Sequence, residues 1–205
     1  MRRNSSRTLL AAVSAALAAV LLIAGGLLLW GSAYVHNTVQ GQLASQQITF
    51  PAAAAFAHPK AGSEITPNMI PSVSQYAGQQ LLTGQQAEAY ADHFIAQHIT
   101  NMSGGKTYSQ LSALSIAQPN NTQLTGLVGT VFKGETLRSM LLNAYGWWKV
   151  SQITYIAALF SFGLGTVSFL AGLFGFASLR HDRKLAGAKA PVIEQITEAG
   201  HEANA

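Results

Sequence analysis

Four side chains that could bind a metal ion fall close together in the sequence: Glu88, Asp92, His93 and His98. Two histidines that chelate one ion from a single helix need a spacing of three or four residues. His93 and His98 project about 140° apart around a helix axis, because they are not at that spacing. The pattern therefore predicts no metal site, and a metal-dependent envelope enzyme is only the third hypothesis for function.

His98 has a second interpretation, because it lies in the middle of an apolar helix face. A helical period of 3.6 residues places it with Ala87, Tyr90, Ala91, Phe94, Ile95 and Met102. No carboxylate lies one turn away, so we expect a neutral core histidine held by a hydrogen bond. The functional alternative is a pH-sensitive core residue, whose protonation would change the packing around it.

Other catalytic patterns are incomplete. Gly105-Lys106-Thr107 copies the end of a phosphate-binding loop, but position 100 is Thr where the full pattern needs Gly. We interpret these residues as a helix stop followed by a helix cap. The sequence has no Cys, which excludes a cysteine nucleophile and a metal site with thiolate ligands. It also has no Gly-x-Ser-x-Gly motif, which excludes the nucleophile elbow of the α/β-hydrolases. We predict no catalytic residue and no cofactor.

The composition indicates a lipid environment. Only 10% of the 205 residues are charged, against about 25% in an average soluble domain. Two long stretches carry no charge, 9–31 and 150–179. Each is long enough to cross a bilayer as a helix, since about 20 residues suffice. The sequence predicts transmembrane helices there, and neither contains a charge that would serve an ion pathway.

Basic residues outside the two spans predict their orientation. Arginines precede the first span, and Arg180, Arg183 and Lys184 follow the second. Lys and Arg stay in the cytoplasm, so 1–8 and 180–205 should be cytoplasmic and 32–149 extracytoplasmic. Aromatic residues agree, because five would form one interfacial belt on the outer side: Trp30, Tyr34, Trp147, Trp148 and Tyr155. A cleaved signal peptide is the alternative for the first span, but such apolar regions have only about 7–15 residues.

The second span carries a stripe of small residues. Their spacing alternates between three and four, which is the 3.5-residue period of a left-handed helix pair: Ala158, Ser161, Gly165, Ser168, Gly172 and Gly175. This small-residue seam should allow close helix packing. Its partner is the first span, which offers Ala11, Ala15, Ala18 and Gly25, or alternatively another membrane protein or a second copy of the chain.

The segment 32–149 is expected to be a small α-helical domain inserted between the spans. Residues 50–75 contain four prolines and predict an extended loop. Capping boxes predict helices after Thr83 and Thr107, and Gly104 should end the first of them. Residues 119–132 allow either helix or strand, and a continuous helix should run from Glu135 to Leu179. The tail after Lys184 predicts a flexible segment. The fold class is mostly α.

Three segments resemble an uncharacterised family of small actinobacterial membrane proteins with two spans. They are Ala87-Glu88-Ala89-Tyr90-Ala91-Asp92-His93, Gly104-Gly105-Lys106-Thr107-Tyr108-Ser109 and Gly134-Glu135-Thr136-Leu137-Arg138. The resemblance implies a two-span topology and no established activity. Some members carry an aromatic ring-opening dioxygenase label. Such iron chemistry needs two His and one carboxylate, and no such ligands are suitably spaced here.

The leading hypothesis is a non-enzymatic integral protein of the cell (plasma) membrane that acts as an accessory or interaction subunit. Its expected partners are membrane lipid and another membrane protein or itself, bound through the small-residue seam. The near-balanced charge of 32–149 argues against nucleic acid. The alternative is an extracytoplasmic sensor, in which a ligand or proton shifts the two spans.

Overall fold

The computed structural model describes residues 2–59 and 65–202, with side chains described over 6–59 and 65–181. The chain divides into two units. The helix-pair unit contains Met1–Trp30 and Tyr155–Ala205, and the middle unit is Gly31–Thr154. The described residues are mostly helical and form no sheet. Their β-type pairing is limited to an isolated antiparallel bridge between Thr49 and Gln80.

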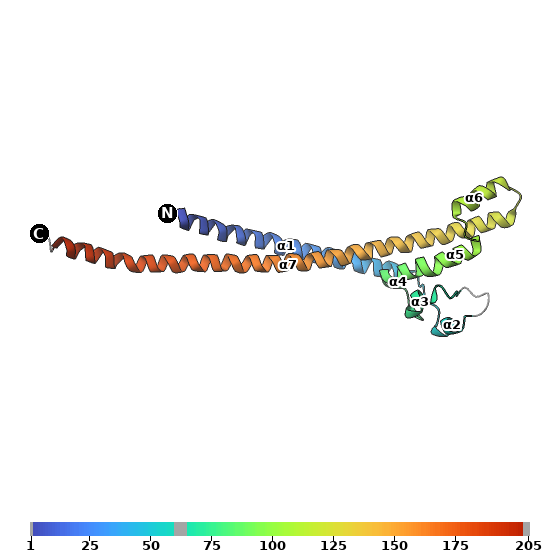
Figure 1. Cartoon of the computed structure of the whole chain (residues 1–205), viewed down its shortest axis with the longest axis horizontal. Coiled ribbons are helices and arrows are strands. Elements are labelled where there is room, and N and C mark those ends of the chain that lie inside the picture. Colours follow the sequence, from blue (N-terminus) through green and yellow to red (C-terminus); the bar gives the residue numbers. More distant parts are fainter. Residues whose placement is uncertain (1, 60–64, 203–205) are drawn as a thin grey trace. The chain divides into compact units, whose positions relative to one another are not determined.

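Two long helices begin and end the structure: α1 is Arg2–Ser45 and α7 is Thr122–Glu202 (Figure 1). The segments Ser6–Ser45 and Thr122–His181 are long and apolar enough to cross a membrane. In the helix-pair unit, α1 and α7 run side by side in opposite directions (Figure 1). Large apolar side chains cover the outside of this unit; Leu10, Val20, Ile23, Phe160 and Phe174 are all more than 60% exposed.

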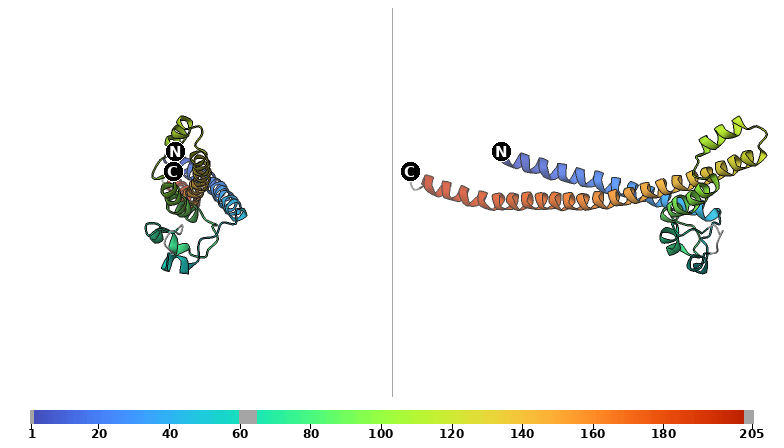
Figure 2. Two further views of the ribbon diagram at one scale, coloured as in Figure 1. Left: turned by 90° about the vertical axis from the view of Figure 1, so that its right-hand side faces the viewer. Right: turned by 45° about the vertical axis from the view of Figure 1, so that its right-hand side comes forward.

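The middle unit contains the short helices. They are α2 (Ala53–Ala57), α3 (Ile70–Val73), the 3₁₀ turn η1 (Ser74–Tyr76), α4 (Gly84–Ala89), the π-helical segment η2 (Tyr90–Ile95), α5 (Ala96–Ser103) and α6 (Tyr108–Ala117). Helix α6 folds back against the start of α7, as both figures show (Figures 1 and 2). The Tyr108 and Phe132 rings are 5.5 Å apart there, and Ser115 bonds to Thr125.

The core of the middle unit lies between the two long helices and the short ones. Val39 and Leu43 come from α1, and Val131, Leu141 and Trp148 come from α7. The short helices and loops add the rest: Phe50, Phe56, Met69, Val73, Leu81, Ala87, Ala91, Phe94, Ile95, Ile99 and Leu111. Burial of these apolar side chains supplies the main stabilisation of the unit, at about 25 cal/mol per Å².

The helix starts predicted after Thr83 and Thr107 and the helix end predicted at Gly104 are confirmed. The Thr83 hydroxyl accepts a hydrogen bond from the Gln86 amide, and the Gln86 side chain accepts one from the Thr83 amide. Thr107 and Gln110 form the same capping box at the start of α6. Gly104 ends α5 with φ 60°, a left-handed conformation that glycine adopts without a steric penalty. Lys106 therefore lies between a helix stop and a helix cap.

The proline-rich segment 50–75 is more helical than predicted. Helices α2 and α3 form within it, and Phe56, Met69 and Val73 are buried. Pro71 lies in the first turn of α3, where a missing backbone N–H costs nothing. The prediction treated each proline as a helix breaker, although a proline also starts helices well. Residues 60–64 of this segment lie outside the described residues.

Helix α7 is longer at both ends than the predicted span from Glu135 to Leu179. Asn121 caps its first turn by accepting a hydrogen bond from the Leu124 amide, so the ambiguous segment 119–132 is helical from Thr122 onward. Helix α7 continues through Gly134 without a break. This glycine allows α7 to pack closely against α5, because a Cβ there would stand 3.0 Å from Ile99 Cδ1. Helix α7 continues to Glu202 through the tail that was predicted to be flexible, and 203–205 lie outside the described residues.

Trp148 is buried in the core of the middle unit, and its assignment to an interfacial belt is wrong. It is 5% exposed and its ring lies 4.0 Å from the His36 ring. The other belt residues are exposed: Trp30, Tyr34, Trp147 and Tyr155. Gly84, the first residue of α4, makes the burial possible, because a Cβ at this position would overlap the Cβ and Cγ atoms of Trp148.

We expect Gly84→Ala to lower the free energy of unfolding by about 1–3 kcal/mol, since the added methyl group overpacks the core. Gly126→Ala in α7 is the matched control, because a Cβ there meets no atom within 4 Å. This control should be neutral or stabilise by up to about 1 kcal/mol. Thermal unfolding of the full chain in mild detergent, followed by near-ultraviolet circular dichroism, measures both. Equal effects of the two substitutions would contradict the packing at Gly84.

Candidate functional site

The small-residue seam of α7 faces α1 within the helix-pair unit. Ala158 is fully buried and Ser161 is 9% exposed. Gly165 and Gly172 are buried, while Ser168 and Gly175 are half-buried. The neighbouring large side chains are exposed, Phe160 and Phe174 among them. The predicted pairing between the seam and the first span is therefore present in the structure.

Close contacts along the seam involve backbone as well as side chains. A Cβ at Gly172 would lie 3.4 Å from the Ala15 nitrogen, and one at Gly175 would lie 2.9 Å from the Ala11 Cβ. A Cβ at Gly165 would lie 3.1 Å from two atoms of Leu22. Small residues allow two helix backbones to approach closely, which is the usual basis of helix pairing in lipid.

The facing side of α1 repeats every seven residues. Ala11, Ala18 and Gly25 are buried, and the Phe162 ring lies over Gly25, where a Cβ would stand 3.2 Å from it. The same spacing continues to Ser32 and Val39 in the middle unit, and both are buried. The sequence analysis missed this continuation, although the seven-residue period was a readable signal.

One buried serine in each unit bonds to the opposite long helix. In the helix-pair unit, the Ser161 hydroxyl donates to the Leu21 carbonyl oxygen at 2.8 Å. In the middle unit, the Ser32 hydroxyl donates to the Ser151 carbonyl oxygen at 2.7 Å. Both bonds satisfy a hydroxyl that would otherwise be costly to bury. They also fix the register of α1 against α7 within each unit.

A groove in the middle unit is a candidate for ligand binding. Its volume is about 600 Å³, within the range of about 300–1,000 Å³ found for small-molecule sites. Helices η2 and α5 form one wall, and α7 forms the other. The lining residues are Tyr90, Phe94, Ile95, His98, Ile99, Asn101, Met102, Thr130, Lys133, Gly134 and Leu137.

An aromatic ladder leads from the core to this groove. Tyr90 stacks on Phe94 with ring centroids 4.8 Å apart, and Phe94 meets His98 edge-on at 4.5 Å. Phe50 packs edge-on against Tyr90 at 5.3 Å, which anchors the ladder in the core. These rings give the groove a wall that is apolar and held in place by packing.

His98 is half-buried in the groove wall, not enclosed in the core as predicted. The π-helical segment η2 explains the difference. Its i→i+5 hydrogen bonding places one more residue in the turn than an α-helix does, which rotates all residues that follow. Met102 is consequently 48% exposed, although the 3.6-residue period placed it on the buried face. The prediction of a pH-sensitive residue at His98 remains a prediction.

An ion pair connects η2 to α7 beside the groove. Arg138 contacts the Asp92 carboxylate through Nε at 3.2 Å and Nη2 at 2.7 Å. The sequence analysis did not pair these residues, and Glu135 lies farther from Arg138, at 3.5 Å. The hydrogen bonding that Arg138 donates to the Asp92 carboxylate is the main cause that raises the pKa of Arg138 above its ordinary value. The side chains are about one third exposed, so this pair contributes at most about 1 kcal/mol.

The other candidate metal ligands do not form a site. Glu88 lies in α4, His93 lies in η2, and the Asp92 carboxylate is bound by Arg138. Among the described residues, no group of three His, Asp or Glu side chains could hold a metal ion.

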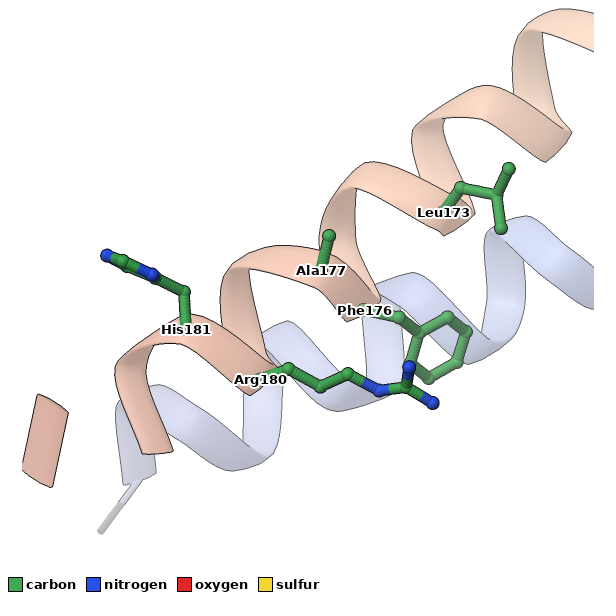
Figure 3. Close-up of a pocket in the computed structure, with 5 residues that line it drawn as sticks. All are labelled: Leu173, Phe176, Ala177, Arg180 and His181. Carbon is green, nitrogen blue, oxygen red and sulfur yellow. The ribbon is translucent and has the colours of Figure 1, made fainter. Parts of the chain in front are cut away.

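A second open groove, of about 610 Å³, lies near the end of the apolar part of α7 in the helix-pair unit. Figure 3 shows its lining residues Leu173, Phe176, Ala177, Arg180 and His181, with Arg180 and Phe176 on one side of the helix and His181 on the other. An apolar surface next to an arginine is typical of the boundary between hydrocarbon and lipid headgroups.

Comparisons of the chain with protein families, with curated proteins and with solved structures gave no match, so the candidate sites are defined by their geometry alone.

Proposed function

We propose that the chain is a non-enzymatic integral protein of the cell membrane that acts as an accessory or interaction subunit of the cell envelope. The observation that carries this proposal is the helix-pair unit. Its inner surface is filled by the chain's own small residues, and its outer surface is covered by exposed Leu, Ile, Val and Phe side chains. Lipid is the environment in which such an outer surface is stable.

In this proposal both termini are cytoplasmic and the middle unit lies on the opposite side of the membrane. The basic residues support the orientation. Arg7 precedes the apolar stretch of α1, and Arg180 follows the apolar stretch of α7. The groove in Figure 3 fits the same arrangement, because Arg180 would reach lipid headgroups while Leu173 and Phe176 stay in hydrocarbon.

The interaction surface is proposed to lie outside the small-residue seam. Ala158 and Gly172 already pack against α1, so a partner in the membrane would have to contact exposed residues of the pair. Phe160 and Phe174 are 71% and 79% exposed and are the most exposed Phe side chains among the described residues of α7. They offer an apolar surface to either lipid or another helix.

A sensor is the second candidate. The observation that favours it is that α1 and α7 supply core residues to the middle unit and also form the apolar helix pair, without a break in either helix. A ligand that moved α5 against α7 in the middle unit would act directly on a membrane-spanning helix.

Cysteine labelling tests the orientation without background, because the chain has no Cys. Gln118→Cys, exposed between α6 and α7, should react with a membrane-impermeant maleimide in intact cells. Ala188→Cys in the tail is the matched control and should react only after lysis. Labelling of Ala188→Cys in intact cells, with Gln118→Cys protected, would contradict the proposed orientation.

In-cell photo-crosslinking tests the accessory-subunit proposal. A benzophenone amino acid at Phe160 or Phe174 should give one protein adduct of fixed mass, because these side chains point away from α1. The same probe in place of Phe162, whose ring lies over Gly25 of α1, is the control, and it should give no intermolecular adduct. Adducts with lipid alone from both exposed positions, together with a monomeric mass in mild detergent, would count against an interaction subunit.

A further inference from the structure

We propose that the groove between α5 and α7 in the middle unit binds a small amphiphilic anion with an apolar or aromatic body and a single carboxylate. The ligand's body would lie along Phe94, Met102 and Leu137, and its carboxylate would meet Lys133. This inference goes beyond the proposed function, because it assigns a ligand to a surface that the accessory role does not require.

The groove combines a firm wall with an accessible apolar surface. Phe94 and Ile99 are 7% and 5% exposed, so their positions are fixed by the core. Met102 and Leu137 are 48% and 37% exposed at the groove. A ligand that covers these two side chains gains hydrophobic free energy in proportion to the area removed from water. Met102 is unbranched and flexible, which lets it adapt to the shape of the ligand.

The shape of the groove is set where α5 approaches α7. Gly134 has no side chain, and the Ile99 side chain approaches to 3.0 Å from the place where a Cβ would stand. Nearby, the bond between Asp92 and Arg138 holds η2 against the same helix. The groove is therefore formed before any ligand arrives, which reduces the entropy lost on binding.

The charge of the lining residues selects an anion. Lys133 is the one residue with a permanent positive charge among the described lining residues, and no Asp or Glu is among them. The structure describes no ion pair that engages Lys133, whereas the nearby Asp92 is already bound by Arg138. Asn101, Thr130 and His98 add polar groups at the same groove. A carboxylate would gain a charge-assisted hydrogen bond from Lys133, and a cation would gain none.

The test uses the full chain in nanodiscs of neutral phosphatidylcholine, with 1-naphthaleneacetate as the anionic probe and 1-naphthylmethylamine as the cationic one. Titration calorimetry, corrected with empty nanodiscs, should show saturable binding of the carboxylate and none of the amine. Lys133→Gln should weaken carboxylate binding about three- to tenfold, which is the range for loss of one exposed charge contact. Lys106→Gln is the matched control, an exposed lysine outside the groove, and should bind like the unmodified chain.

A second pair of variants tests the apolar part of the site. Leu137→Asp places a carboxylate in the groove and should abolish binding of the anionic probe. Leu114→Asp on α6 is its control, because Leu114 is similarly exposed, at 38%, and lies outside the groove. The native mass of each variant is measured alongside.

Absence of saturable binding in the unmodified chain would overturn the proposal. Equal binding of the probe by Lys133→Gln, Leu137→Asp and their controls would also overturn it, since the probe would then bind outside the groove. A dimer of the unmodified chain that is lost only in Leu137→Asp would assign the groove to a second copy instead. None of these results alters the crosslinking test above, so failure of the ligand proposal is distinguishable from failure of the accessory role.

Discussion

Close approach between α1 and α7 is the constraint on which the structure depends. Gly172 lies against the backbone of α1, and the Ser161 hydroxyl bonds to the Leu21 carbonyl oxygen. Neither contact tolerates a large side chain. In lipid, apolar side chains gain nothing by leaving the solvent, so packing at short range and buried hydrogen bonds supply most of the attraction between two helices. The seam therefore explains why the small residues of the two spans face inward and the large ones face outward.

Close approach between helices also shapes the middle unit, where burial of apolar side chains in a core adds to the stability. Gly84 makes room for Trp148, and Gly134 makes room for Ile99. These two glycines bring α4 and α5 against α7, and the π-helical turn between them changes which side chains reach the core. The groove is a consequence of that turn, because His98 and Met102 would otherwise belong to the buried face. A local change in helical period therefore decides which side chains line the groove.

Much of the fold could be predicted from sequence because local chemistry determines it. Thr83, Thr107 and Gly104 define helix ends through bonds and backbone angles within a few residues of themselves. The seam was readable for the same reason, since a 3.5-residue period is a local pattern. The two apolar helices follow from length and composition.

The remaining features depend on residues that are distant in sequence. An aromatic residue at the end of an apolar stretch fits a membrane interface and a core equally well, and only Gly84 on α4 decides that Trp148 is buried. Asp92 and Arg138 are 46 residues apart, and neither predicts the other. The π-helical turn has no sequence signal of its own, so the groove and the place of His98 within it could not be predicted.

The most direct test of the α1–α7 pairing is a disulfide between engineered cysteines in the chain, which has none of its own. Ala11→Cys with Gly175→Cys joins positions that are in contact across the seam, whereas Ala12→Cys with Gly175→Cys uses an exposed neighbour as control. Mild oxidation in membranes, followed by non-reducing electrophoresis, should give an intramolecular bond and a monomer for the first pair only. Disulfide-linked dimers from the first pair, or equal reaction of both pairs, would contradict pairing of the seam within one chain.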